Sequence, residues 1–172
     1  ATGVTAHDYV VDLHEPLLPR VRKTLRHTLQ KPIVGIIERT QSTTDIATAF
    51  SLYVRHMRSV QNFVLPKAAF TALCREYGGE LWVWRATAAA QPDAMAIFLP
   101  ADSSVLYSLS AARSSAYNVY APQHLVHHAL EQYRQEGKVV ASLGATGVGS
   151  ALEVFKRGWR GTSYRIFTLG TG

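Results

Sequence analysis

The sequence predicts an α/β protein with a central mixed β-sheet and helices on both faces. The chain has 172 residues, 47% hydrophobic and 17% charged, a composition that is typical of a packed core. Short β-rich runs alternate with amphipathic segments of helical period. Two of these runs, 80–87 and 94–100, are apolar almost throughout. Strands buried on both faces have this pattern, so helices are expected to cover the sheet on both sides.

The first forty residues predict a strand, a helix and a second strand. Tyr9 to Leu13 is a short β-rich run, and Pro16 is expected to open a helix that continues to about Gln30. Ile33 to Arg39 is rich in β-branched residues and predicts the second strand.

Two further helices are expected next. Ser42 predicts a helix start, with Asp45 completing a capping box, and the apolar face of this helix extends to Val60. Pro66 opens the following helix, which the Gly78-Gly79 pair ends. The residues expected on the buried face of the Pro66 helix are Phe70, Leu73, Cys74 and Tyr77.

The remaining elements give the sheet its mixed character. Strands are expected over 80–87, 94–100 and 105–111, a helix from Pro122 to Gly137, a strand over 139–143, a helix over 150–159 and a strand over 164–169. A three-strand meander followed by a βαβ step predicts a mixed sheet. We expect one domain over 1–172, in which 1–40 precedes a core of 42–172.

The net charge of +6 is unevenly distributed. One early segment contains Arg20, Arg22, Lys23, Arg26, His27 and Lys31. Such a cluster favours an anionic partner (a phosphate, nucleotide, RNA or lipid headgroup) and is equally typical of a solvated helix face. No apolar stretch is long enough to span a bilayer, and no charged-then-apolar leader is visible, so the cytoplasm is the expected location. The lone Cys74 excludes an internal disulfide.

A motif near the carboxyl end carries the clearest functional signal. Phe155-Lys156-Arg157-Gly158-Trp159-Arg160-Gly161 resembles the Phe-Lys-x-x-Phe-Gly-Gly signature of FemAB-like acyltransferases, a branch of the GNAT superfamily. The segment from Gly137 to Gly144 resembles the stretch in which a helix of that family ends in Gly and a strand leads to Asp-Leu-Gly. The order of elements is also that of GNAT acyltransferases. The resemblance implies transfer of an acyl or aminoacyl group, from acyl-CoA or aminoacyl-tRNA, to a small-molecule or peptide amine in cell-wall, exopolysaccharide or peptide biosynthesis.

The resemblance also assigns roles to individual residues. It implies that Lys156 stabilises the charge of the acyl-transfer intermediate and that Phe155 lies beside the acceptor end of a tRNA. Arg157 and Arg160 are candidate substrate-binding cations in the same motif. The chain departs from the family at two positions: Ser142 stands where Asp is usual, and Arg160 replaces the first Gly of the closing pair.

The segment before the Pro122 helix differs from that of coenzyme A-dependent GNAT enzymes, which carry an Arg/Gln-x-x-Gly-x-Gly/Ala loop there. Residues 112–121 contain no glycine. At the helix start, Gln123 and His124 are candidates for binding a donor phosphate, with Arg113 assisting. Tyr117 and Tyr120 are candidates for stacking on a base or donating a proton, although loop tyrosines more often pack against the sheet.

Three interpretations of the single domain stay open. FemAB-like enzymes normally carry two such domains, so this chain is a fragment, a homodimer that replaces the missing half, or a catalytically degenerate module that binds an anionic ligand or RNA. His124, His127 and His128 suggest a metal site, but only Glu131 lies nearby as a further ligand, and no metal is expected.

Overall fold

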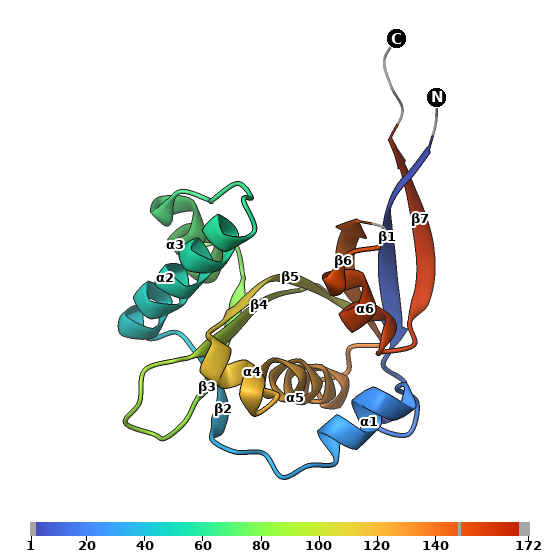
Figure 1. Cartoon of the computed structure of the whole chain (residues 1–172), viewed down its shortest axis with the longest axis horizontal. Coiled ribbons are helices and arrows are strands. Elements are labelled where there is room, and N and C mark those ends of the chain that lie inside the picture. The colour runs from blue at the N-terminus through green and yellow to red at the C-terminus, as the bar shows by residue number, and fades with distance from the viewer. Residues whose placement is uncertain (1–2, 148, 169–172) are drawn as a thin grey trace.

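The computed structural model describes residues 3–147 and 149–168 and contains one seven-stranded sheet in the order β2-β3-β4-β5-β6-β1-β7 (Figure 1). The strands are β1 (Gly3–Asp12), β2 (Ile36–Thr40), β3 (Glu80–Arg85), β4 (Ala94–Pro100), β5 (Ser104–Ala112), β6 (Val140–Gly147) and β7 (Thr162–Thr168). The helices are α1 (Lys23–Leu29), α2 (Thr43–Ser59), α3 (Lys67–Arg75), α4 (Ser114–Asn118), α5 (Ala121–Gln135) and α6 (Ala151–Arg157). Among the described strands, β5 and β6 pair in parallel and the other neighbours pair antiparallel, which confirms the predicted mixed sheet.

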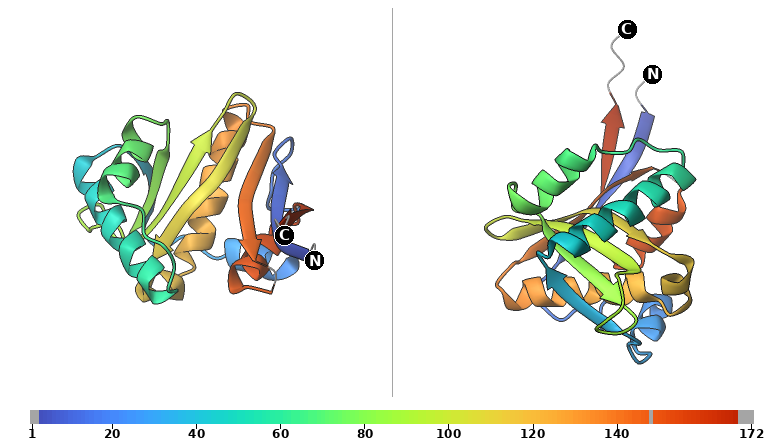
Figure 2. Two further views of the ribbon diagram at one scale, coloured as in Figure 1. Left: turned by 90° about the horizontal axis from the view of Figure 1, so that it is seen from above. Right: turned by 90° about the vertical axis from the view of Figure 1, so that its left-hand side faces the viewer.

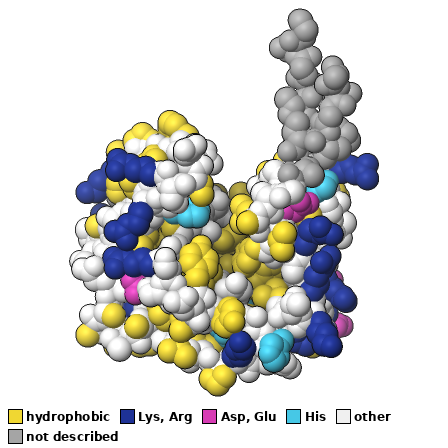
Figure 3. Space-filling view, viewed as in Figure 1, with side chains coloured by type: hydrophobic (Ala, Val, Ile, Leu, Met, Phe, Trp, Pro, Cys, Tyr) yellow, Lys and Arg dark blue, Asp and Glu magenta, His cyan; other side chains and the backbone are white. Residues whose placement is uncertain are grey.

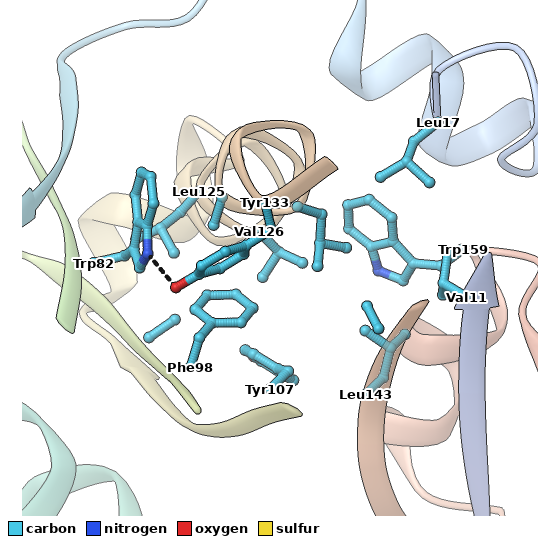
Figure 4. Close-up of a cluster of buried hydrophobic side chains, with 14 of the residues drawn as sticks. Val11, Leu17, Trp82, Phe98, Tyr107, Leu125, Val126, Tyr133, Leu143 and Trp159 are labelled. Carbon is cyan, nitrogen blue, oxygen red and sulfur yellow. Dashed lines mark hydrogen bonds between the residues drawn. The ribbon is translucent and has the colours of Figure 1, made fainter. Parts of the chain in front are cut away.

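Helices cover both faces of the sheet, as predicted (Figure 2). Because side chains alternate along a strand, Trp82 and Trp84 share one face of β3 while Leu81 and Val83 share the other. The tryptophans belong to the core beneath α5, where the indole Nε1 of Trp82 donates to the hydroxyl of Tyr133 at 3.0 Å (Figure 4). The opposite face packs against α2 and α3.

The N-terminal strand lies between two C-terminal ones. β1 pairs antiparallel with β6 on one side and with β7 on the other (Figure 1). The first twelve residues therefore contribute directly to the part of the sheet that carries α6. The division into 1–40 and 42–172 stays a prediction.

The first helix is shorter than predicted, because α1 begins at Lys23 rather than at Pro16. Two tertiary hydrogen bonds hold the preceding backbone in another conformation. The amide of Leu17 donates to the carboxylate of Glu131 at 2.6 Å, and the amide of Arg22 donates to the carbonyl of Gly158 at 2.9 Å. Such contacts override helix propensity, which is a weak preference.

The second helix starts as predicted, but its capping box is incomplete. The hydroxyl of Ser42 accepts from the amide of Asp45 at 3.4 Å. The carboxylate of Asp45 does not return to the backbone of Ser42. It accepts from the hydroxyl of Thr40 at 2.8 Å and from the guanidinium of Arg85 at 2.9 Å.

Two smaller differences concern the end of α3 and one short helix. Tyr77 was expected on a buried face but is 73% exposed, because α3 ends at Arg75. Cys74 is buried as expected, and burial raises the pKa of its thiol to about 11. The short helix α4 was not predicted, and Leu169 of the last predicted strand lies outside the described residues.

In the described part of the chain, no helix is both long and apolar enough to cross a membrane.

Candidate active site

The candidate site lies where the two parallel strands separate. β5 and β6 pair over three residue pairs, the last of which is Leu106 with Ser142. Just beyond, Gly144 has a φ of 75°, and a Cβ on it would lie 3.1 Å from the carbonyl oxygen of Tyr107. Figure 3 shows that this side of the molecule is hollowed between the α2–α3 part and the β6-β1-β7 part, with apolar side chains inside the hollow. Leu106, the last residue of β5 to pair with β6, is 37% exposed.

Lys156 brings a buried ammonium to this point. The side chain comes from α6, and the residue is 3% exposed. Its Nζ donates to the carbonyl of Gly144 at 2.7 Å and to the carbonyl of Ala145 at 3.2 Å. Burial lowers the pKa of Lys156 to about 8, and the negative charge of Asp8 opposes that shift. The group is thus mainly protonated at neutral pH, with one of its three N–H donors left for another acceptor.

Glu153 fixes the helix that carries Lys156. The hydroxyl of Ser150 caps α6 by accepting from the amide of Glu153 at 3.1 Å. The carboxylate of Glu153 is buried against β1, where it accepts from Tyr9 at 2.8 Å and pairs with His7 at 2.9 Å. It also accepts from the amide of Gly149 at 2.6 Å. These bonds, that from His7 first, lower the pKa of Glu153 to about 2.

Sequence reasoning missed Glu153. The Ser-x-x-Glu spacing from Ser150 is a capping-box pattern and could have marked it. Since three residues advance a helix by almost one turn, Glu153 and Lys156 share the inward face of α6.

Phe155, the other predicted catalytic residue, packs against the core rather than beside Lys156. Its ring lies 6.0 Å from that of Trp159, and Trp159 is buried and stacks on His127 at 6.5 Å. Arg157 is exposed at the end of α6.

The closing pair of the motif shows why glycine is usual there. Arg160 adopts a φ of 53°, a left-handed conformation that favours glycine. A Cβ on Gly161 would lie 2.7 Å from the carbonyl oxygen of Val10, so the second position requires glycine. The side chain of Arg160 lines a pocket of about 360 Å³ together with Arg20 and Asp12.

The candidate donor-binding residues form a separate group around the start of α5. Arg113 pairs with Asp93 at 3.2 Å, and Tyr117 is half-exposed. Tyr120 has a φ of 57° and stacks under the ammonium of Lys31 at 4.3 Å. His124 is buried, which lowers its pKa, and its Nε2 has no partner among the described residues.

Gln123 is half-buried, and its side-chain oxygen also has no partner among the described residues. Within residues 3–147 and 149–168, no hydrogen bond or ion pair joins this group to Lys156, and no cluster of three or more His, Cys, Asp or Glu residues could hold a metal ion.

No protein-family model and no curated protein matches the sequence. Solved structures do match. FemX superposes with a TM-score of 0.80 at 11% sequence identity, over 91% of this chain and 59% of FemX. L-PGS from Bacillus licheniformis gives 0.64 at 12% identity, over 97% of this chain and 60% of that protein. A GCN5-related N-acetyltransferase from Kribbella flavida gives 0.52 at 10% identity, over 89% of this chain and 33% of that one.

The chain has the fold of the FemAB-like GNAT branch. Similarity at 10–12% identity shows the fold alone, and at that level it confirms both the fold class and the resemblance predicted from the motif. The chain spans about 60% of the length of FemX and of L-PGS. The Phe-Lys motif forms the end of α6 and the turn into β7, and it places Lys156 beside the separating strands.

Proposed function

We propose that this chain transfers an acyl or aminoacyl group from an activated donor to an amine. The observation that supports this proposal most strongly is the buried ammonium of Lys156 at the separation of β5 and β6, with two of its three donors held by backbone carbonyls. A neutral amine attacks the donor carbonyl, and negative charge develops on the carbonyl oxygen. The remaining N–H of Lys156 donates to that oxygen.

The intermediate collapses by breaking the bond to the leaving group. The attacking nitrogen loses a proton, and the departing thiolate or ribose oxygen gains one, so the charges balance. A fixed donor to an oxyanion contributes about 2.7–4 kcal/mol of barrier lowering in a site poor in water. No covalent enzyme intermediate is needed, in agreement with a buried, weakly acidic Cys74.

Between the two donor classes, the geometry favours an aminoacyl-tRNA over acyl-CoA. A coenzyme A pyrophosphate would use free amides at the start of α5. Here Ala121 and His124 of that first turn are buried, α4 packs beside it, and Tyr120 is covered by Lys31. The proposed acceptor is a small-molecule or peptide amine, and the proposed location is the cytoplasm. We also propose a homodimer, in which a second copy of the chain takes the place of the part that FemX and L-PGS contain beyond the matched region.

A second candidate function follows from the same burial. With 3% exposure, Lys156 is nearly closed off from solvent, which favours a non-catalytic module that keeps the fold and binds an anionic ligand or RNA. Such binding would weaken steeply with added salt and would not be followed by turnover.

Donor turnover separates these proposals. Aminoacylated tRNA, acetyl-CoA and a longer acyl-CoA are each mixed with the chain and a set of amines, and new amide is measured by mass spectrometry. Lys156→Met removes the charge while keeping an unbranched side chain, and Lys156→Arg keeps the charge. Amide formed by the wild type and lost in Lys156→Met supports the transferase. Salt-sensitive RNA binding without amide, unchanged in Lys156→Met, supports the binding module instead.

A further inference from the structure

A chain of hydrogen bonds leads from β1 through β6 to Lys156. The hydroxyl of Ser142 lies 3.0 Å from each carboxylate oxygen of Asp8. The same hydroxyl oxygen accepts from the amide of Gly144 at 3.1 Å. The carbonyl of Gly144 then accepts from the Nζ of Lys156 at 2.7 Å. Both faces of the Gly144 residue are thus held: its N–H from the Asp8 side and its C=O from the Lys156 side.

We propose that Asp8 is a positioning residue for Lys156, acting through Ser142 and Gly144. This inference rests on the proposed function, because it explains how the ammonium is aimed. It assigns Ser142 a specific role: its single hydrogen points to Asp8, so its lone pairs are free to accept from Gly144.

The direction of each bond depends on the carboxylate. An ionised carboxylate only accepts hydrogen bonds, so it forces the Ser142 hydroxyl to donate toward Asp8. With that hydrogen fixed, the Gly144 amide meets an acceptor rather than a competing donor. The backbone of Gly144 is then fixed on both sides of its Cα, in a left-handed conformation that glycine tolerates. Without the carboxylate the hydroxyl is free to rotate, and the carbonyl that binds Lys156 is less well defined.

The charge of Asp8 acts in the same direction. Burial disfavours the ammonium form of Lys156, and the negative charge of Asp8 is the one influence that restores it among the described residues. The other nearby carboxylate, Glu153, is already occupied by His7 and Tyr9. Two carboxylates at positions 8 and 142 would repel each other at hydrogen-bond distance. The resemblance leads one to expect Asp at position 142, but this chain has Ser there. The carboxylate is supplied instead by Asp8 on the neighbouring strand β1, and Ser142 donates a hydrogen bond to it.

A charge swap tests this assignment. Asp8→Ser removes the carboxylate, Ser142→Asp creates the repelling pair, and the double variant D8S/S142D exchanges the two groups. In the double variant, Asp at 142 accepts from both the Ser at 8 and the Gly144 amide, so both bonds are kept. The matched control is Asp12→Ser, a carboxylate on the same strand that binds His14 and Arg20 instead.

The readout is the reactivity of Lys156 toward a small amine-acylating reagent at trace concentration. The chain has five lysines, so each is quantified by mass spectrometry and the other four serve as internal references. Because loss of Asp8 favours the neutral amine, Asp8→Ser is expected to increase labelling of Lys156 at pH 7 by about threefold. The double variant is expected to return to within about twofold of the wild type, and Asp12→Ser to leave Lys156 unchanged.

Unchanged labelling in Asp8→Ser, or a double variant whose labelling stays as high as that of Asp8→Ser, overturns the assignment. Asp8→Asn covers the case in which Asp8→Ser does not fold, because Asn keeps the shape and an acceptor oxygen but removes the charge; it too must raise labelling. Labelling needs no donor, so the assignment survives even if no donor is turned over and the proposed function fails. If turnover is found, a kcat that falls in Asp8→Ser at constant KM and recovers in the swap supports positioning. A kcat loss without any change in labelling contradicts it.

Discussion

At the scale of single residues, Lys156 combines two opposing effects. The burial that would make its ammonium effective against a developing oxyanion also disfavours that ammonium, which lowers its pKa to about 8. The resemblance in the motif identified this lysine, but its surroundings were not predictable. Asp8 and Glu153 meet their partners across sequence separations of 134 and 146 residues, and no local pattern encodes such contacts.

The lowered pKa of Lys156 predicts a rise in stability with pH. Between the folded pKa of about 8 and the ordinary value of 10.5, the unfolded chain binds more protons than the folded one, so the free energy of unfolding increases with pH. Relative to Lys156→Met, the wild type should gain about 1 kcal/mol per pH unit in this window. Urea unfolding at pH 7.5, 8.5 and 9.5 measures the difference. Parallel curves for the two proteins would contradict the lowered pKa.

Arg160 predicts a stabilising substitution. A non-glycine residue in the left-handed region costs roughly 1–2 kcal/mol. Glycine removes this strain, but its larger conformational entropy in the unfolded chain offsets part of the gain. Arg160→Gly should therefore raise the free energy of unfolding by about 0.5–1 kcal/mol. Arg55→Gly, the same replacement on an exposed site inside α2, should lower it by about 1 kcal/mol. Chemical denaturation of both variants checks the opposite signs; a loss in Arg160→Gly would mean that its side chain makes a stabilising contact.

At the scale of elements, prediction succeeded where the pattern was local. Ala94–Pro100 was predicted residue for residue, since a continuous apolar run between turn signals defines it. The start of α1 was wrong because Leu17 and Arg22 bond to α5 and to the turn after α6, partners that lie far away in sequence. α4 was missed because five residues are too few to show a helical period.

The attachment of α6 to β1 predicts an acid-sensitive element. The pKa of Glu153 is lowered to about 2, so its contribution to stability is complete above the ordinary value of 4.5 and is lost as the pH falls toward 2. Glu153→Gln should remove this dependence. The variant should be less stable than the wild type at pH 7, but its stability should fall less between pH 7 and pH 3. Thermal unfolding at pH 7, 4 and 3 tests this, with the exposed Glu76→Gln as a control that should follow the wild type.

At the scale of the whole molecule, β1 joins the beginning of the chain to its C-terminal elements. It lies between β6 and β7, second from one edge of the sheet, and it also supplies Asp8, Tyr9 and His7 to the groups that hold the Lys156 region. The sequence indicated a strand here but not its neighbours, because pairing partners in a sheet are set by packing between distant segments.

This arrangement predicts that β1 is required for folding of the entire sheet. A chain that begins at Leu13 would expose the edges of β6 and β7 and leave the Glu153 carboxylate without Tyr9 and His7. We expect it to lose cooperative thermal unfolding. A synthetic peptide of residues 3–14 should restore that transition by strand addition, since both neighbouring edges are formed by backbone groups. A peptide with Tyr9 and Val11 changed to Asn should not, because these side chains are buried in the core beneath α5. If the truncated chain unfolds cooperatively on its own, the remaining six strands suffice, and β1 serves only the site.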